Sequence, residues 1–176
     1  MLPKGAKILD VGCGPGGDVK FFLEMGYFAQ GIDMSKEMIK IAKRKVPDGI
    51  FSIMDMRRLG YIDESFDGVF AAYSLIHIPA REVVSTLKEF NRVLKKGGVM
   101  FLAVREGRGE GFIKEPLDET KKIFVKSFTQ EELDWYLKQA GFSPIKFEKK
   151  VEKERTGDVC TKKLFVIAKK VNAFLD

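Results

Sequence analysis

The chain has few residues of the kinds that bind metals or form covalent cross-links. Cys13 and Cys160 are its two cysteines among 176 residues, and His77 is its one histidine. Two separated thiols and one imidazole cannot build a cysteine-rich zinc site or a disulfide framework. The sequence therefore predicts no metal centre and favours a reducing compartment.

Long hydrophobic runs and an export signal are also missing. No apolar stretch approaches the roughly 18 residues that a membrane-spanning helix needs, and charged residues make up 32% of the chain. The first residues, MLPKGAKILD, lack the apolar middle and the cleavage site of a secretory signal. We expect a cytoplasmic protein that does not span a membrane.

Side-chain amides are scarce, with two asparagines and three glutamines, whereas lysine and glutamate are abundant. This composition is found in proteins of thermophiles. The net charge of +6 suits nucleic acid, but the densest basic stretch, residues 146–153, alternates its lysines with glutamates. We interpret that stretch as a solvated strand face, so nucleic acid is the less favoured partner.

Short apolar runs of strand length alternate with stretches that carry apolar residues at helical spacing. That alternation is typical of a parallel α/β sheet, and 45% hydrophobic residues can fill its core. Because no linker or repeat interrupts the pattern, residues 1–176 are expected to form one domain. The expected strands are residues 6–11, 28–32, 50–54, 66–72 and 99–104, followed by a hairpin of residues 143–148 and 159–168.

Start and stop signals place helices between these strands. Ser35 can cap the second helix, and the third should cover residues 80–95. Thr129 and Glu132 form a T-x-x-E capping box for the last helix.

Residues 105–127 show no clear period and are too long for a simple connector. We expect them to form a functional lid or an insertion. A lid of this composition could recognise an anionic acceptor through its basic and aromatic residues, which are Arg105, Arg108, Phe112, Lys114, Lys121, Lys122 and Phe124.

A glycine-rich loop, GCGPGG at residues 12–17, follows the first strand and opens a helix. Gly12, Gly14 and Gly17 satisfy the pattern G-x-G-x-x-G, and Asp33 ends the second strand 21 residues after Gly12. Glycines let the backbone approach a ligand closely, and a carboxylate at that strand end can accept both ribose hydroxyls. The pattern fits any ligand that contains a nucleoside.

Charge distinguishes between the possible nucleosides. Asp10 precedes the loop, Asp18 lies in the first turn of the next helix, and Pro15 removes one backbone N–H. A pyrophosphate would meet carboxylates where it needs amide donors, whereas a cation would be stabilised. These residues favour S-adenosylmethionine, which carries a sulfonium and an ammonium beside its adenosine.

A third carboxylate supports that choice. Asp55 follows the third strand, so Asp10, Asp33 and Asp55 stand at the carboxyl ends of three successive strands. In an open parallel sheet, that edge forms the ligand crevice. We expect the three side chains to line one wall of it.

These features resemble the class I S-adenosylmethionine-dependent methyltransferases, in particular the group often called methyltransferase type 11. The resemblance implies S-adenosylmethionine as the cofactor. It also implies a single Rossmann-like, doubly wound α/β sheet of seven strands in the order 3-2-1-4-5-7-6, with strand 7 antiparallel. The blocks that carry it, in the family's order, are ILDVGCGPGG, GIDMS, IMDMRRL, SFDGVFAAYSLIHIP, RVLKKGGVMFLAV and FTQEELDWYLKQAGF.

The resemblance also implies roles for individual residues. Cys13 belongs to the cofactor loop, where we expect it to pack rather than to act as a nucleophile. The implied cofactor contacts are Asp10, Gly12 and Gly14 around the methionine part, Cys13 in the same loop, Asp33 at the ribose, Met34, Asp55 and Met56 at the adenine, and Ala72 and Tyr73 near the reacting methyl.

Methyl transfer from a sulfonium is an in-line displacement that needs alignment and exclusion of water more than a dedicated catalyst. An acceptor that must lose a proton gains from a nearby base. His77 lies just beyond the fourth strand, where the acceptor should be, and is the candidate base. Tyr73 could orient the acceptor, and a purely structural role is the alternative for both residues.

Relatives in this family usually carry a helical segment before the first strand, whereas this chain begins almost at that strand. We therefore expect the N-terminal lid helices to be absent and the acceptor side to be open. Residues 105–127, a second copy in a homodimer or a separate partner could cover it, or the acceptor could be too large to enclose.

The leading hypothesis is methyl transfer to an O, N or C atom of a small-molecule acceptor. An RNA methyltransferase is one alternative, although AAYSLIHIP lacks the Asn/Asp-Pro-Pro-aromatic motif of base amino-methylation. A module that binds the cofactor without catalysis is another. An NAD-dependent oxidoreductase is a third, and NADH rather than S-adenosylhomocysteine would stabilise it.

Overall fold

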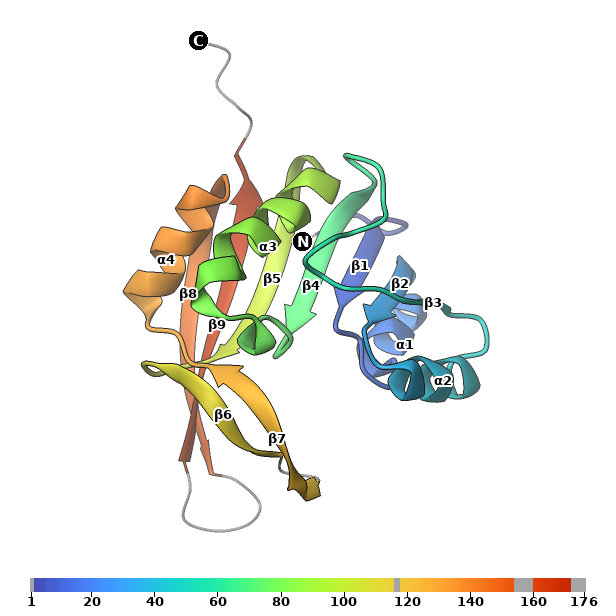
Figure 1. Cartoon of the computed structure of the whole chain (residues 1–176). Helices are drawn as coiled ribbons and strands as arrows, with labels where there is room; N and C mark the ends of the chain where they lie inside the picture. Colours follow the sequence, from blue (N-terminus) through green and yellow to red (C-terminus); the bar gives the residue numbers. More distant parts are fainter. Residues whose placement is uncertain (1, 116–117, 154–159, 172–176) are drawn as a thin grey trace.

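A computed structural model describes residues 2–115, 118–153 and 160–171 (Figure 1). The expected turn of the last hairpin, near residues 154–158, and the tail 172–176 lie outside the described residues. The strands are β1 (Lys7–Val11), β2 (Phe28–Asp33), β3 (Ile50–Ile53), β4 (Phe66–Ala72), β5 (Leu94–Arg105), β6 (Glu110–Glu115), β7 (Asp118–Lys126), β8 (Phe142–Lys153) and β9 (Cys160–Lys170). The helices are α1 (Gly17–Glu24), α2 (Lys36–Lys45), the 3-10 turn η1 (Leu75–His77), α3 (Ala80–Val93) and α4 (Gln130–Gln139).

A seven-stranded sheet runs through the molecule in the order β3-β2-β1-β4-β5-β9-β8. The pairs from β3 to β5 are parallel, and β9 is antiparallel to both of its neighbours. This order differs from the expected 3-2-1-4-5-7-6 because two unforeseen strands, β6 and β7, precede the last two strands of the sheet in the chain. They form a separate antiparallel hairpin.

Local signals fix where the helices begin. The hydroxyl of Ser35 accepts a hydrogen bond from the N–H of Met38 at 3.2 Å, and Thr129 accepts one from Glu132 at 3.1 Å. Both N-caps satisfy backbone donors that have no partner inside the helix, and both were expected from the sequence. Helix α3 ends at Val93, earlier than expected, because β5 already begins at Leu94 and continues through a register shift.

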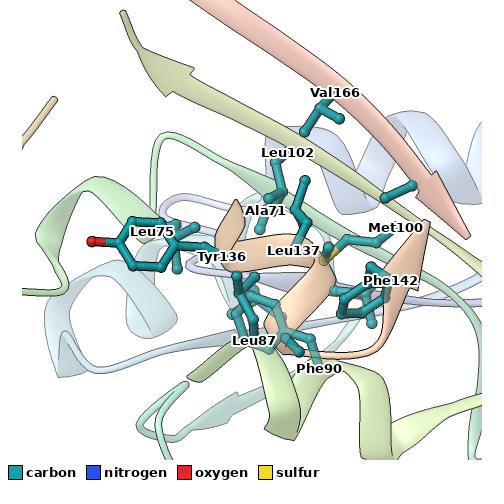
Figure 2. Packing of buried hydrophobic residues seen from close by; sticks show 14 of the residues in the cluster. Ala71, Leu75, Leu87, Phe90, Met100, Leu102, Tyr136, Leu137, Phe142 and Val166 are labelled. Atoms are coloured by element: carbon teal, nitrogen blue, oxygen red, sulfur yellow. The ribbon is translucent and has the colours of Figure 1, made fainter. Parts of the chain in front are cut away.

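Helices cover both faces of the sheet because its strands send alternate side chains to opposite sides. Leu9 of β1 packs in a core beneath α3 and α4, whereas Ile8 packs in a second core beneath α1 and α2. Figure 2 shows the larger core, where side chains of β4, β5 and β9 meet those of α3 and α4. Truncating Leu87 or Phe90, which are fully buried there, should destabilise the fold by about 2–5 kcal/mol.

The β6–β7 hairpin projects from the end of the sheet where β4 and β5 finish (Figure 1). Phe112 and Phe124 face each other across its two strands, with ring centroids 5.6 Å apart. The sequence of residues 105–127, expected to form a lid or an insertion, shows no period that would predict these strands. Phe112 is 70% exposed and the hairpin carries no buried stripe in β6, so its strands lack the alternation of a half-buried sheet.

A buried ion pair anchors the base of the hairpin to α4. Lys126 at the end of β7 is 3% exposed, and its ammonium lies 2.7 Å from the carboxylate of Glu132. Tyr136 donates a hydrogen bond to the same carboxylate at 3.0 Å. Burial and this carboxylate raise the pKa of Tyr136 to about 12. The hairpin is thus tied to the helical layer rather than attached only through its two ends.

Among the described residues, none of the helices is long and apolar enough to cross a membrane.

Candidate functional site

The loop after β1 turns against the end of β4. The N–H groups of Gly12 and Cys13 both bond to the carbonyl of Ile32 at the end of β2, at 2.8 and 2.9 Å. Gly12 has a φ of 75°, and a Cβ there would collide with the Cβ of Ser74. The first glycine is therefore required by close packing of the loop on the residue that follows Tyr73.

Gly14 forms an open ledge beside Asp33. It has a φ of 50°, and a Cβ there would meet no heavy atom within 4 Å in the described part of the chain. Its N–H donates to Oδ2 of Asp33 at 3.0 Å, and Ser35 donates its N–H to Oδ1 at 2.8 Å. Each carboxylate oxygen keeps a further lone pair, so Asp33 is held in place and can still accept hydroxyl groups.

Asp10 is a buried carboxyl beneath this loop. It is 2% exposed, and its Oδ2 has no hydrogen-bond partner among the described residues. Burial raises its pKa to about 8, and the nearby carboxylates of Asp18 and Asp33 add to the shift. A buried, unpartnered carboxyl in a field of its own sign favours a cation as its neighbour.

A cavity of about 230 Å³ lies at the carboxyl edge of the sheet. Of the residues expected at the site, Asp10, Cys13, Gly14, Asp55 and Ala72 are not among those that line it. Cys13, Asp55 and Ala72 are next to lining residues in the chain, whereas Asp10 and Gly14 are each two residues from Gly12. Met54 and Ser74 also line the cavity and were not expected, because their place there depends on which strand ends meet. The lining residues are Gly12, Asp33, Met34, Met54, Met56, Tyr73, Ser74 and His77.

Asp55, expected in a wall of three carboxylates, is not among the residues that line the cavity with Asp33. The guanidinium of Arg57 donates hydrogen bonds to both oxygens of Asp55, the shortest 2.6 Å, and reaches Glu82 at 2.9 Å with its other terminal nitrogen. The Arg57 guanidinium lowers the pKa of Asp55. Arg57 thus joins the loop after β3, through Asp55, to the first turn of α3, whereas Asp10 and Asp33 come close enough to interact.

Tyr73 occupies the switch between β4 and η1 with a strained backbone. Its φ is 56°, a left-handed conformation that is uncommon for a bulky side chain. Its N–H donates to the carbonyl of Ala103 at 2.8 Å, and the ammonium of Lys163 lies 5.6 Å from the centre of its ring. Strain of this kind is concentrated at functional sites, and here it turns the chain into the cavity.

His77 lines the cavity at the end of η1. Its side chain is exposed, and Nδ1 lies 2.9 Å from the carbonyl oxygen of Phe124 in β7. A carbonyl can only accept a hydrogen bond, so Nδ1 carries a hydrogen in this arrangement. In the neutral ring, the unprotonated nitrogen is then Nε2.

Cys13 behaves as a packing residue, as expected. Its thiol is free and buried, and a Cβ on Gly31 would lie 2.7 Å from its sulfur. Burial, reinforced by Asp10 and Asp33, raises the pKa of the thiol to about 12. The raised pKa disfavours the thiolate, which supports a packing role for Cys13 over a nucleophilic one.

Sequence comparison places the chain among known methyltransferases. Residues 8–98, just over half of the chain, match the family described as "Methyltransferase domain". Methyltransferase GfsG of Streptomyces halstedii is 33% identical over 131 residues, which cover 70% of this chain and 44% of that protein. The chain spans less than half the length of the first curated relatives it matches, with coverage of 33–44%.

Two solved structures are similar in fold. A SAM-dependent methyltransferase of Methanosarcina mazei superposes with a TM-score of 0.87 at 24% identity, covering 97% of this chain and 94% of that chain. The 1,6-didemethyltoxoflavin-N1-methyltransferase of Burkholderia thailandensis, with its acceptor and S-adenosylhomocysteine bound, gives 0.75 at 23% identity and covers 96% and 72%. The family match and the glycine loop beside Asp33 show that the chain belongs to the class I S-adenosylmethionine-dependent methyltransferases.

Proposed function

We propose that the chain binds S-adenosylmethionine and transfers its methyl group to an O, N or C atom of a small molecule. The observation that carries this proposal is the buried carboxyl of Asp10, which lacks a partner for Oδ2 in the described part of the chain. A cationic ligand beside it would favour the ionised form and lower its raised pKa. A diphosphate would add charge of the same sign, which argues against NAD.

The loop and the strand ends fit the parts of this cofactor. We assign the methionine part to Asp10, Gly12, Cys13 and Gly14, because their loop provides both the carboxyl and the open ledge. We assign the ribose to Asp33, which lines the cavity with lone pairs to spare.

The adenine would lie among the methionines that line the cavity. Met34 is 59% exposed, and a flat base would cover this apolar surface. Met56 lines the same wall and can offer its backbone N–H. Asp55 can accept from the adenine amine only after it gives up a bond to Arg57. Ala72 would lie beside the methyl group at the end of β4.

The chain's own residues would align the acceptor and exclude water. S-adenosylmethionine, when bound, supplies a methyl group on a positively charged sulfur, which is a good leaving group. Tyr73 and Ser74 would border the methyl group, and His77 would contact the acceptor and take up its proton. A small molecule suits this site because the cavity measures about 230 Å³ and the β6–β7 hairpin contacts His77, which lines it. The Burkholderia thailandensis protein, of the same fold, binds such an acceptor.

Ligand binding tests the cofactor first. S-adenosylhomocysteine should raise the melting temperature of the chain, and NADH should leave it unchanged. Asp33→Ala should abolish the shift, whereas Asp48→Ala, which removes an exposed carboxylate away from the cavity, should preserve it.

Transfer of an isotope-labelled methyl group then tests the reaction. Incubated with a cell extract, the protein should label the small-molecule fraction, and Asp33→Ala should remove that label. Label in the RNA fraction would show that the acceptor is RNA and not a small molecule. Tight binding with no label in any fraction would instead support the non-catalytic module.

A further inference from the structure

The β6–β7 hairpin touches the candidate base directly. Strand β7 packs along η1, and the carbonyl of Phe124 holds Nδ1 of His77 at 2.9 Å. This bond comes from the backbone of a paired strand, because Phe124 is matched with Phe112 across the hairpin. The position of the Phe124 carbonyl oxygen is therefore fixed by the strand pairing and not by a mobile side chain.

A second bond holds the other strand of the hairpin to the same region. Glu110, at the start of β6, accepts a hydrogen bond from the N–H of Ala80 at 2.7 Å. Ala80 begins α3 three residues after His77, and its N–H is one of the donors that a helix leaves without an internal partner. Both strands thus contact the short segment that carries the imidazole.

The base of the hairpin adds a third attachment. Lys126 is buried against Glu132 of α4, and its ammonium lies 4.8 Å from the centre of the Phe128 ring. The buried pair fixes the end of β7 two residues beyond Phe124. A strand held at both η1 and α4 keeps its carbonyl in one position relative to His77.

We propose that the β6–β7 hairpin is a positioning element that keeps Nδ1 of His77 protonated, so that Nε2 is the base for acceptors with a protic nucleophile. This inference rests on the proposed function. The acceptor's O–H or N–H bond breaks and its proton passes to Nε2, which leaves His77 as an imidazolium. The acceptor atom forms its new bond to the methyl carbon, and the electron pair of the broken carbon–sulfur bond stays on sulfur. Hydroxyl and N–H acceptors are therefore the substrate class of this site.

Nitrogen NMR of the free protein tests the tautomer without a substrate. Since His77 is the one histidine, ¹⁵N-histidine labelling gives a single imidazole signal set. At about pH 8.5, where an ordinary imidazole is neutral, Nδ1 should carry the hydrogen and Nε2 should appear unprotonated. A ring that is mainly protonated at Nε2 would overturn the proposal, whether or not the protein binds S-adenosylhomocysteine.

Two substitutions at Glu110 test the role of the hairpin. Glu110→Ala removes the acceptor for the Ala80 N–H and should at least double the fraction of the Nε2-protonated tautomer. Glu110→Gln keeps an oxygen there and should retain the wild-type ratio. Equal ratios in all three proteins would show that Glu110 has no positioning role.

A substitution of His77 tests whether its imidazole acts as a base or only holds the hairpin in place. His77→Asn keeps an N–H near Nδ1 that can bond to the Phe124 carbonyl, but it has no counterpart of Nε2. S-adenosylhomocysteine binding should persist, while methyl transfer to a deproteinised small-molecule extract should fall by about 100-fold or more in kcat. Transfer within about threefold of the wild type would show that the imidazole serves only as a clamp. If the wild type itself does not bind S-adenosylhomocysteine, the proposed function is refuted. The NMR measurement would still decide which nitrogen of His77 carries the hydrogen.

Discussion

On the cofactor side of the cleft, formed by the loop after β1 and the ends of β2 and β3, the carboxyl of Asp10 is buried with an unpartnered Oδ2 among the described residues. On the acceptor side, formed by η1 and the β6–β7 hairpin, His77, Glu110 and Lys126 each have a defined partner. On the cofactor side, the buried carboxyl of Asp10 therefore lowers the stability of the free protein, and a cationic ligand would provide the missing partner. The contacts that tie the hairpin to η1, α3 and α4 are already formed without a ligand, although the buried hydroxyl of Ser74 at the start of η1 has no hydrogen-bond partner among the described residues.

The largest expected effect is a change in stability when Asp10, on the cofactor side, is replaced. Its pKa is raised from 3.8 to about 8 on folding, so the folded state keeps a proton that the unfolded state loses. The stability from this proton is complete below about pH 4 and is lost as the pH rises through 8, with a slope up to about 1.4 kcal/mol per pH unit. Asp10→Asn should remove this slope, which amounts to a gain on the order of 5 kcal/mol at pH 8.

Urea unfolding between pH 4 and 9 measures that slope. Asp48→Asn, at an exposed carboxylate, is the matched control and should follow the wild type. Parallel curves for Asp10→Asn and the wild type would mean that Asp10 is paired or solvated in the free protein.

Gly12→Ala should break the contact between the two sides. Its Cβ would collide with Ser74 and its φ of 75° is unfavourable for alanine, so we expect a loss of about 3 kcal/mol, or roughly 6–12 °C in Tm. Gly17→Ala is the control, because a Cβ there meets no described atom within 4 Å and alanine favours a helix. Equal melting temperatures for the two variants would contradict the close packing of the loop.

Glu132→Gln, on the acceptor side, should lower the stability, whereas Asp10→Asn on the cofactor side should raise it. It leaves the buried ammonium of Lys126 without its carboxylate and should destabilise the protein by about 2 kcal/mol at pH 8. Glu131→Gln, on the exposed side of the same helix turn, should have little effect. A neutral result at Glu132 would show that the hairpin is not anchored through this pair.

The smallest expected effect concerns Asp55. Arg57→Ala should change the stability by no more than about 1 kcal/mol, because both ion pairs of Arg57 are partly exposed. By releasing Asp55 to the adenine, it should tighten S-adenosylhomocysteine binding by about two- to fivefold in calorimetry, which Arg58→Ala should not do. Weaker binding would show that Arg57 supports the cofactor site instead of competing with it.

The same contrast explains what the sequence could predict. The strands of the cofactor side are largely buried, so their apolar runs can be recognised in the sequence. The glycine loop and Asp33 can be recognised from their positions at the ends of these strands. The β6–β7 hairpin lacks such a run, and Ser74 matters only through its contact with Gly12 across two strand ends. Asp55 was expected in the cavity because strand-end position is visible in the sequence, whereas the competing reach of Arg57 is not.

Calorimetry of S-adenosylmethionine binding, repeated at pH 7 in buffers of different ionisation enthalpy, tests the central claim most directly. If Asp10 is the carboxyl that receives the cofactor's positive charge, binding drives its ionisation. The wild type should then release up to about one proton more per ligand than Asp10→Asn, and should bind more tightly. Equal proton release and equal affinity in the two proteins would contradict the account.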